Sequence, residues 1–195
     1  MKVKICGITN AEDAFACEDS GADALGFVHV PGRSRSITLD RIADICASLG
    51  PMTTSVLVCL PSDDKAAMDM IGRSGADIIQ VHSLDPQSLD SVRGSGIGVV
   101  KAVRPNRGEA AIYAEHADAL LFENGVPGTG TGFDYSQTPV DCCRRAIIAG
   151  GLNIDNLERA KVMNPYALDV SSGVESAPGR KDPELVREFI RRCRL

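Results

Sequence analysis

Short apolar runs alternate with segments of helical periodicity along the whole 195-residue chain. The runs are hydrophobic at nearly every position, as expected of parallel strands that are buried on both faces. We predict eight strands, at Val3–Cys6, Ala24–Val28, Thr54–Cys59, Ile78–Val81, Gly98–Ala102, Ala119–Phe122, Ala146–Ala149 and Ala167–Val170. This regular alternation limits the chain to an α/β architecture with a parallel sheet.

Helix starts are predicted between the strands. Asn10, Thr38 and Ser62 are capping residues, each followed by acidic residues that suit the positive end of a helix. Pro86 and Pro183 stand where the first turn of a helix accepts proline, and the last helix is expected to run from Pro183 to about Cys193. Strands and helices therefore form repeated strand–helix units.

Eight such units of roughly two dozen residues each correspond to the compact end of the (β/α)₈, or TIM, barrel range. An open doubly wound sheet is the competing architecture, and it normally carries a G-x-G-x-x-G fingerprint after its first strand. The turn after the first strand reads Cys6-Gly7-Ile8-Thr9 and lacks that fingerprint. No linker or charge block divides the chain. We predict a single (β/α)₈ barrel domain over residues 1–195.

Composition excludes several classes of protein. A net charge of -5 and an aromatic content of 4% without tryptophan argue against nucleic-acid binding. No apolar run is long enough to span a bilayer, and Lys2 and Lys4 interrupt the segment where a signal peptide would lie. The seven cysteines form no C-x-x-C pair, and no histidine stands at zinc-ligand spacing from any of them. We expect a reduced cytoplasmic protein that needs no metal or cofactor.

The first predicted strand ends in Cys6-Gly7. The carboxyl ends of barrel strands carry the reacting groups of barrel enzymes, so a thiol at this position is a candidate catalytic residue. The alternative is a small buried apolar residue, which is what most free cysteines are.

Two loops indicate a phosphate site. Gly150-Gly151-Leu152-Asn153 follows the seventh strand and Asp169-Val170-Ser171-Ser172-Gly173-Val174-Glu175 includes the end of the eighth. Barrels commonly bind phosphate on these two loops, through backbone N–H groups and a short helix, here expected to begin near Ser172. The alternative is two glycine turns at helix starts.

Two further segments are expected at the same mouth. The glycine-rich loop from Glu123 to Gly132 is typical of a lid or binding loop. Arg33 and Arg35 follow the second strand, where guanidinium groups suit a carboxylate or a phosphate. Each arginine alone is more often part of a solvated surface.

The chain resembles the phosphoribosylanthranilate isomerase family. The resemblance is carried in order by Lys4-Ile5-Cys6-Gly7-Ile8-Thr9, Gly21-Ala22-Asp23-Ala24-Leu25-Gly26-Phe27-Val28, Gln80-Val81-His82, Gly130-Thr131-Gly132-Phe133-Asp134-Tyr135, Ala149-Gly150-Gly151-Leu152 and the motif from Asp169 to Glu175. It implies a (β/α)₈ barrel that rearranges N-(5-phosphoribosyl)anthranilate to 1-(2-carboxyphenylamino)-1-deoxyribulose 5-phosphate in tryptophan biosynthesis. The implied partner is a small phosphosugar substrate, bound by a monomer or homodimer.

The resemblance also implies roles for individual residues. Cys6 corresponds to the general base and Arg35 to the residue that binds the anthranilate carboxylate. Substrate-binding roles are further implied for Lys4, His82 and Asp169, and phosphate-binding roles for Gly151, Ser171, Ser172 and Gly173. Lys4 shares the strand parity of Cys6, so it either assists the thiol or pairs with Asp169 on the last strand.

The general acid is where the sequence departs from the family. The family carries an aspartate at the end of the sixth strand, and the predicted register places Phe122 there with Glu123 one residue later. Side chains alternate between faces, so Glu123 is expected to serve only if the strand bulges or ends early. His29, at another unusual position, is the second candidate acid. A different phosphorylated amino-sugar as substrate and a non-catalytic phosphosugar-binding barrel remain alternatives.

Overall fold

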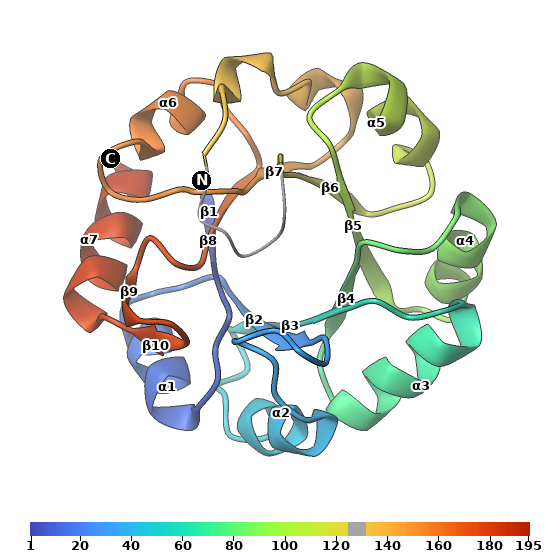
Figure 1. Cartoon of the computed structure of the whole chain (residues 1–195), viewed down its shortest axis with the longest axis horizontal. Coiled ribbons are helices and arrows are strands. Elements are labelled where there is room, and N and C mark those ends of the chain that lie inside the picture. Colours follow the sequence, from blue (N-terminus) through green and yellow to red (C-terminus); the bar gives the residue numbers. More distant parts are fainter. Residues whose placement is uncertain (125–131) are drawn as a thin grey trace.

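The computed structural model describes residues 1–124 and 132–195, in which eight parallel strands close into a barrel in the order β1 to β8 (Figure 1). The strands are β1 Lys2–Cys6, β2 Ala24–His29, β3 Thr54–Cys59, β4 Ile78–Val81, β5 Gly98–Val103, β6 Ala119–Phe122, β7 Ala146–Ile148 and β8 Ala167–Val170. Each predicted strand is confirmed to within one residue at either end. The predicted TIM-barrel fold is confirmed.

Two hydrophobic layers explain why the strands are apolar at nearly every position. One lies between the strands and the outer helices and includes the fully buried Phe27 and Phe122. The other fills the barrel interior with small and branched side chains: Val100, Ala102, Ala119, Leu121, Ile147, Ala149 and Ala167. Burial on both faces removes the polar alternation of an exposed sheet.

Helices surround the barrel (Figure 1). They are α1 Ala11–Asp19, α2 Leu39–Cys46, α3 Asp64–Ser74, α4 Pro86–Gly94, α5 Arg107–Tyr113, α6 Leu157–Lys161 and α7 Pro183–Arg194. Asn10 and Thr38 cap α1 and α2 as predicted, whereas Asp63 and not Ser62 caps α3. Among residues 1–124 and 132–195, no helix combines the length and hydropathy that a bilayer crossing needs.

The chain departs from regular strand–helix alternation between β6 and β7. The described residues there form two 3₁₀ turns, η1 Tyr135–Gln137 and η2 Val140–Cys142, in place of an α-helix. The predicted lid, Glu123 to Gly132, falls largely on residues 125–131, which lie outside the described residues.

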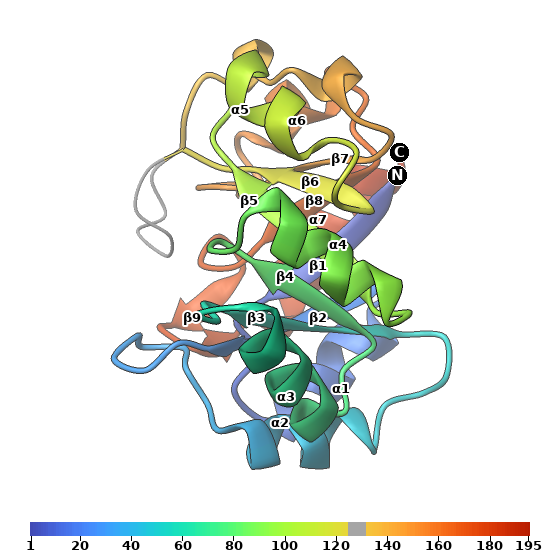
Figure 2. The same cartoon turned by 90° about the vertical axis from the view of Figure 1, so that its right-hand side faces the viewer.

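The short helix predicted near Ser172 is wrong. The segment instead makes turns and leads into a hairpin of β9 Glu175–Ala177 and β10 Arg180–Lys181. The Glu175 carboxylate pairs with Arg35, 140 residues away along the chain, and with Lys181 in the same hairpin, and both contacts favour an extended chain. In the side view, β9 and the loop after β2 project from the end of the barrel opposite the chain termini (Figure 2).

Candidate active site

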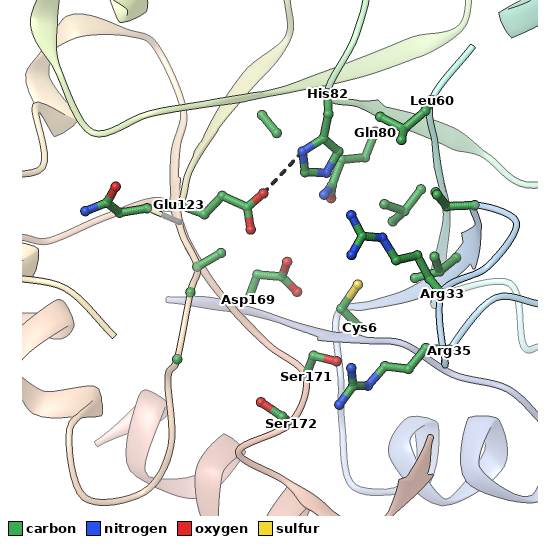
Figure 3. Close-up of a pocket in the computed structure, with 18 of the residues that line it drawn as sticks. Cys6, Arg33, Arg35, Leu60, Gln80, His82, Glu123, Asp169, Ser171 and Ser172 are labelled. Carbon is green, nitrogen blue, oxygen red and sulfur yellow. Dashed lines mark ion pairs between the residues drawn. The ribbon is translucent and has the colours of Figure 1, made fainter. Parts of the chain in front are cut away.

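A cavity of about 680 Å³ opens at the carboxyl ends of the barrel strands. Alternate residues of each strand face the barrel interior, so the position of a residue along its strand decides whether its side chain lines the cavity. Lining residues from four strands or their ends are Cys6, Gln80, His82, Glu123, Asp169 and Ser171 (Figure 3). The residues of the interior hydrophobic layer point to the same face of the strands as these lining residues. They lie deeper in the barrel and form the base of the cavity.

Cys6 lies at the end of β1 beside a buried ion pair. The Lys4 Nζ lies 2.9 Å from the Asp169 Oδ2, and both side chains are less than a tenth exposed. Of the two alternatives predicted for Lys4, the pair with Asp169 is therefore present, and Lys4 also acts on the Cys6 thiol. Burial raises the pKa of the Cys6 thiol above its ordinary value, although the Lys4 ammonium opposes that shift. The resting thiol is therefore protonated at neutral pH.

Glu123 lies across the cavity from Cys6 and contacts His82 (Figure 3). The Glu123 Oε1 lies 3.2 Å from the His82 Nδ1, and each side chain is about one-fifth exposed. Burial, reinforced by the Asp169 carboxylate, raises the pKa of Glu123 to about 7. Burial, with the Lys101, Lys4 and Arg33 cations, lowers the pKa of His82 to about 4. Near neutral pH the imidazole is uncharged and Glu123 holds a proton about half of the time.

The predicted register at the end of β6 is wrong. Phe122 is completely buried in the layer between the strands and the helices, so it points away from the cavity. Glu123 follows the inward parity of Ala119 and Leu121 and lines the cavity. The pairing of β5 with β6 shows no register shift, so no bulge is required.

His29 does not face the cavity. It ends β2 next to the inward-facing Val28, and strand alternation directs it to the opposite face. Its Nδ1 lies 2.9 Å from the Ile37 carbonyl oxygen, in the loop that follows β2. This placement argues against His29, the second candidate, as the general acid.

The two predicted phosphate loops meet at the cavity. Gly151, Ser171 and Ser172 line it, whereas Gly173 lies behind them and forms a β-bridge with Asn153. A β-carbon on Gly173 would lie 1.9 Å from the Leu152 carbonyl oxygen, so only glycine allows the loops to approach this closely. Gly151 has a φ of +67°, a left-handed conformation that also favours glycine.

Arg35 is held by an acidic partner. Its Nε and Nη2 donate to the two carboxylate oxygens of Glu175 at 2.8 and 2.7 Å. The Lys181 Nζ also donates to Glu175, at 2.8 Å. Arg35 also lines the cavity, and among the described residues no hydrogen bond engages its Nη1. Arg33 lines the cavity too, and in the described part of the chain no carboxylate pairs with it.

Gln80 is a cavity residue that belongs to the Gln80-Val81-His82 motif but has no role predicted from the sequence. The residue is 3% exposed, and its Oε1 lacks a hydrogen-bond partner among the described residues. The same is true of the Asp169 Oδ1. Unpaired buried acceptors are uncommon, and a donor from a ligand would satisfy them. The signal was present in the sequence, because Gln80 stands two residues before His82 and shares its strand parity.

The fold and the cavity are those of a (β/α)₈-barrel enzyme, with a thiol and a carboxyl group facing each other across its mouth. A family model described as N-(5'-phosphoribosyl)anthranilate (PRA) isomerase matches residues 3–192. The chain belongs to this family of isomerases.

Individual relatives agree with that assignment. An N-(5'-phosphoribosyl)anthranilate isomerase of Pelobacter propionicus is 38% identical to this chain, over 98% of this chain and 94% of the length of that relative. The crystal structure of phosphoribosyl anthranilate isomerase from Thermus thermophilus superimposes with a TM-score of 0.91 at 36% identity and covers 98% of both chains. A phosphoribosyl anthranilate isomerase in complex with reduced 1-(o-carboxyphenylamino)-1-deoxyribulose 5-phosphate has a TM-score of 0.88 at 33% identity, covering 100% of this chain and 98% of that one.

Proposed function

We propose that the chain converts N-(5-phosphoribosyl)anthranilate to 1-(2-carboxyphenylamino)-1-deoxyribulose 5-phosphate, with Glu123 as general acid and Cys6 as general base. One observation carries this proposal: the Glu123 carboxyl and the Cys6 thiol face one cavity, and Glu123 has a pKa of about 7. A carboxylic acid that keeps its proton near neutral pH can protonate an ether oxygen, as ring opening requires.

The first step opens the furanose ring. Glu123 transfers its proton to the ring oxygen, the bond between that oxygen and C1 breaks, and the nitrogen lone pair forms a C1–N double bond. The product of this step is a protonated Schiff base, and Glu123 becomes a carboxylate. The neutral imidazole of His82, 3.2 Å from the Glu123 Oε1, orients the carboxyl group without competing as an acid.

The second step moves the C2 proton. The Cys6 thiolate removes it, the C–H electrons form a C1–C2 double bond, and the Schiff base nitrogen becomes neutral. The enolamine then loses its C2 hydroxyl proton and gains a proton at C1, which gives the ketone. The Lys4 ammonium favours the thiolate electrostatically, although burial raises the thiol pKa overall. The active form therefore carries a thiolate and a protonated Glu123.

Substrate binding divides between the two sides of the cavity. Backbone and hydroxyl groups of Gly151, Ser171 and Ser172 are proposed to bind the phosphate, with Gly173 supporting the loop. The open side of the Arg35 guanidinium is proposed to bind the anthranilate carboxylate. The unpaired acceptors of Gln80 and Asp169 suit the sugar hydroxyls and the amine. The reaction class is an intramolecular oxidoreduction of the aldose–ketose type, carried out in the cytoplasm by a monomer or homodimer.

The test generates phosphoribosylanthranilate in situ and follows the loss of anthranilate fluorescence. The wild-type protein should show turnover, and Cys6→Ala should remove nearly all of it. Glu123→Gln should lower kcat by about 10²–10⁴-fold, the range expected for loss of a general acid. His29→Ala is the matched control, because His29 lies outside the cavity, and it should keep the wild-type rate. Binding of substrate without turnover by the wild-type protein would overturn the proposal.

A further inference from the structure

Lys101 is a buried cation that the proposed chemistry does not use. It lies in β5 on the face opposite the barrel interior and is 3% exposed. Its Nζ donates to the main-chain carbonyl oxygens of His82 and Ser83, both at 2.7 Å, and lies 4.6 Å from the centre of the Tyr113 ring. Within residues 1–124 and 132–195, no carboxylate forms an ion pair with Lys101, although the more distant Glu109 carboxylate favours its charged form. Burial of an ammonium that pairs with no counter-ion is costly, so we expect a lysine at this position to have a role that offsets the cost.

Two further features indicate that the His82–Ser83 turn, to which Lys101 donates, is constrained. The Ser83 Oγ donates to the Pro61 carbonyl oxygen at 2.7 Å, which ties the turn to the loop after β3. Leu84 has a φ of +64°, a left-handed conformation that non-glycine residues rarely adopt. Such backbone geometry persists only where surrounding contacts enforce it, and it occurs often at functional sites.

His82 connects this turn to the cavity. Its main-chain carbonyl accepts from Lys101, and its side chain lies inside the cavity with the Nδ1 3.2 Å from the Glu123 Oε1 (Figure 3). A shift of the turn would therefore move the imidazole relative to the Glu123 carboxyl. Active-site groups must be held to within about half an ångström to remain productive, so such a shift would impair proton transfer.

We propose that Lys101 is a positioning residue for the acid step: it fixes the His82–Ser83 turn so that His82 orients the carboxyl of Glu123. This inference rests on the proposed role of Glu123 as general acid. A lysine that only stabilises the fold would lower activity independently of Glu123. A lysine that acts through His82 and Glu123 loses its effect when Glu123 can no longer donate a proton.

The experiment is a double-mutant cycle between Lys101 and Glu123, read as kcat and KM for phosphoribosylanthranilate. Lys101→Met removes the donors and keeps the side-chain volume. In the wild-type background it should lower kcat about tenfold while KM changes less than twofold, within the range of coupling between contacting groups. In the Glu123→Gln background it should lower kcat less than twofold. Tyr113→Leu is the matched control, because it removes the ring contact and leaves both carbonyl contacts in place.

Ser83→Ala is the second variant. It removes the hydrogen bond from the Ser83 Oγ to the Pro61 carbonyl oxygen, which loosens the same turn, and it leaves the buried Lys101 ammonium unchanged. It should lower kcat about two- to threefold, again only when Glu123 is present. An equal loss for Lys101→Met in both backgrounds, or no loss in either, would overturn the positioning role. Failure of the proposed function is a separate result, because Glu123→Gln alone would then keep the wild-type kcat.

Discussion

Gly26 lies opposite Cys6 across the ladder between β1 and β2, and a β-carbon at Gly26 would lie 2.8 Å from the Cys6 Sγ. It would also lie 3.0 Å from the Lys4 Cε. The side chains of Cys6 and Lys4 both face the barrel interior, where they are the proposed base and the cation beside it. Space at Gly26 is therefore a condition for the arrangement of the site.

Gly26→Ala should displace the thiol and lower kcat/KM at least tenfold, about 1.4 kcal/mol of lost transition-state stabilisation. The fluorescence assay measures the loss. Gly72→Ala is the control, because Gly72 lies in α3 and no atom lies within 4 Å of a β-carbon built there. That variant should keep full activity. A fully active Gly26→Ala enzyme would show that the position of Cys6 is not critical.

The proposed contact between Arg35 and the substrate carboxylate is tested by removing either partner. Arg35→Lys should lower kcat/KM for phosphoribosylanthranilate about ten- to a hundredfold, because an ammonium cannot reproduce the planar guanidinium. Phosphoribosylaniline, which lacks the carboxylate, should be turned over at similar rates by both proteins. Arg33→Lys serves as the control in the same loop and should change kcat/KM less than threefold at moderate salt. An equal loss on both substrates would assign Arg35 to holding Glu175 alone.

The buried pair of Lys4 and Asp169 is expected to dominate local stability. Asp169→Asn leaves the Lys4 ammonium buried without a counter-ion and should lower the free energy of unfolding by about 3–5 kcal/mol. Asp141→Asn breaks the exposed pair with Arg107, in which both side chains are about two-thirds exposed, and should lower it by less than about 1 kcal/mol. Urea unfolding followed by circular dichroism measures both values. Similar losses for the two variants would show that Lys4 does not depend on Asp169.

The barrel was predictable because every strand is a separate apolar run with polar segments on both sides. The same property concealed part of the site. Strands buried on both faces lack a polar–apolar alternation, so the sequence does not show which parity faces the interior. The predicted faces of Phe122 and Glu123 are therefore wrong, and the sequence does not reveal that His29 faces away from the cavity.

Contacts distant in sequence account for the other differences. The helix expected near Ser172 is absent because Glu175 pairs with Arg35, which lies 140 residues away along the chain. The pairing of Lys101 with the carbonyls of His82 and Ser83 likewise depends on how neighbouring strands are placed. Local propensity contains no information on either contact.

The dependence of kcat/KM on pH tests the acid–base assignment most directly. With a Glu123 pKa of about 7 and a Cys6 pKa above its ordinary value, the active form is a minor tautomer of the singly protonated pair. Below pH 7 both groups are protonated, and above the thiol pKa both are ionised, so activity falls in both directions. His82, with a pKa of about 4, stays neutral throughout this range.

The measurement is the pH profile of kcat/KM for the wild-type enzyme and for Glu123→Gln. The wild-type profile should be bell-shaped, with an acid limb near pH 7 and a plateau above it. In Glu123→Gln the residual activity should instead rise about tenfold per pH unit through that plateau, because only the ionisation of Cys6 remains. A Glu123→Gln profile that keeps the acid limb near pH 7 would contradict the assignment of Glu123 as general acid.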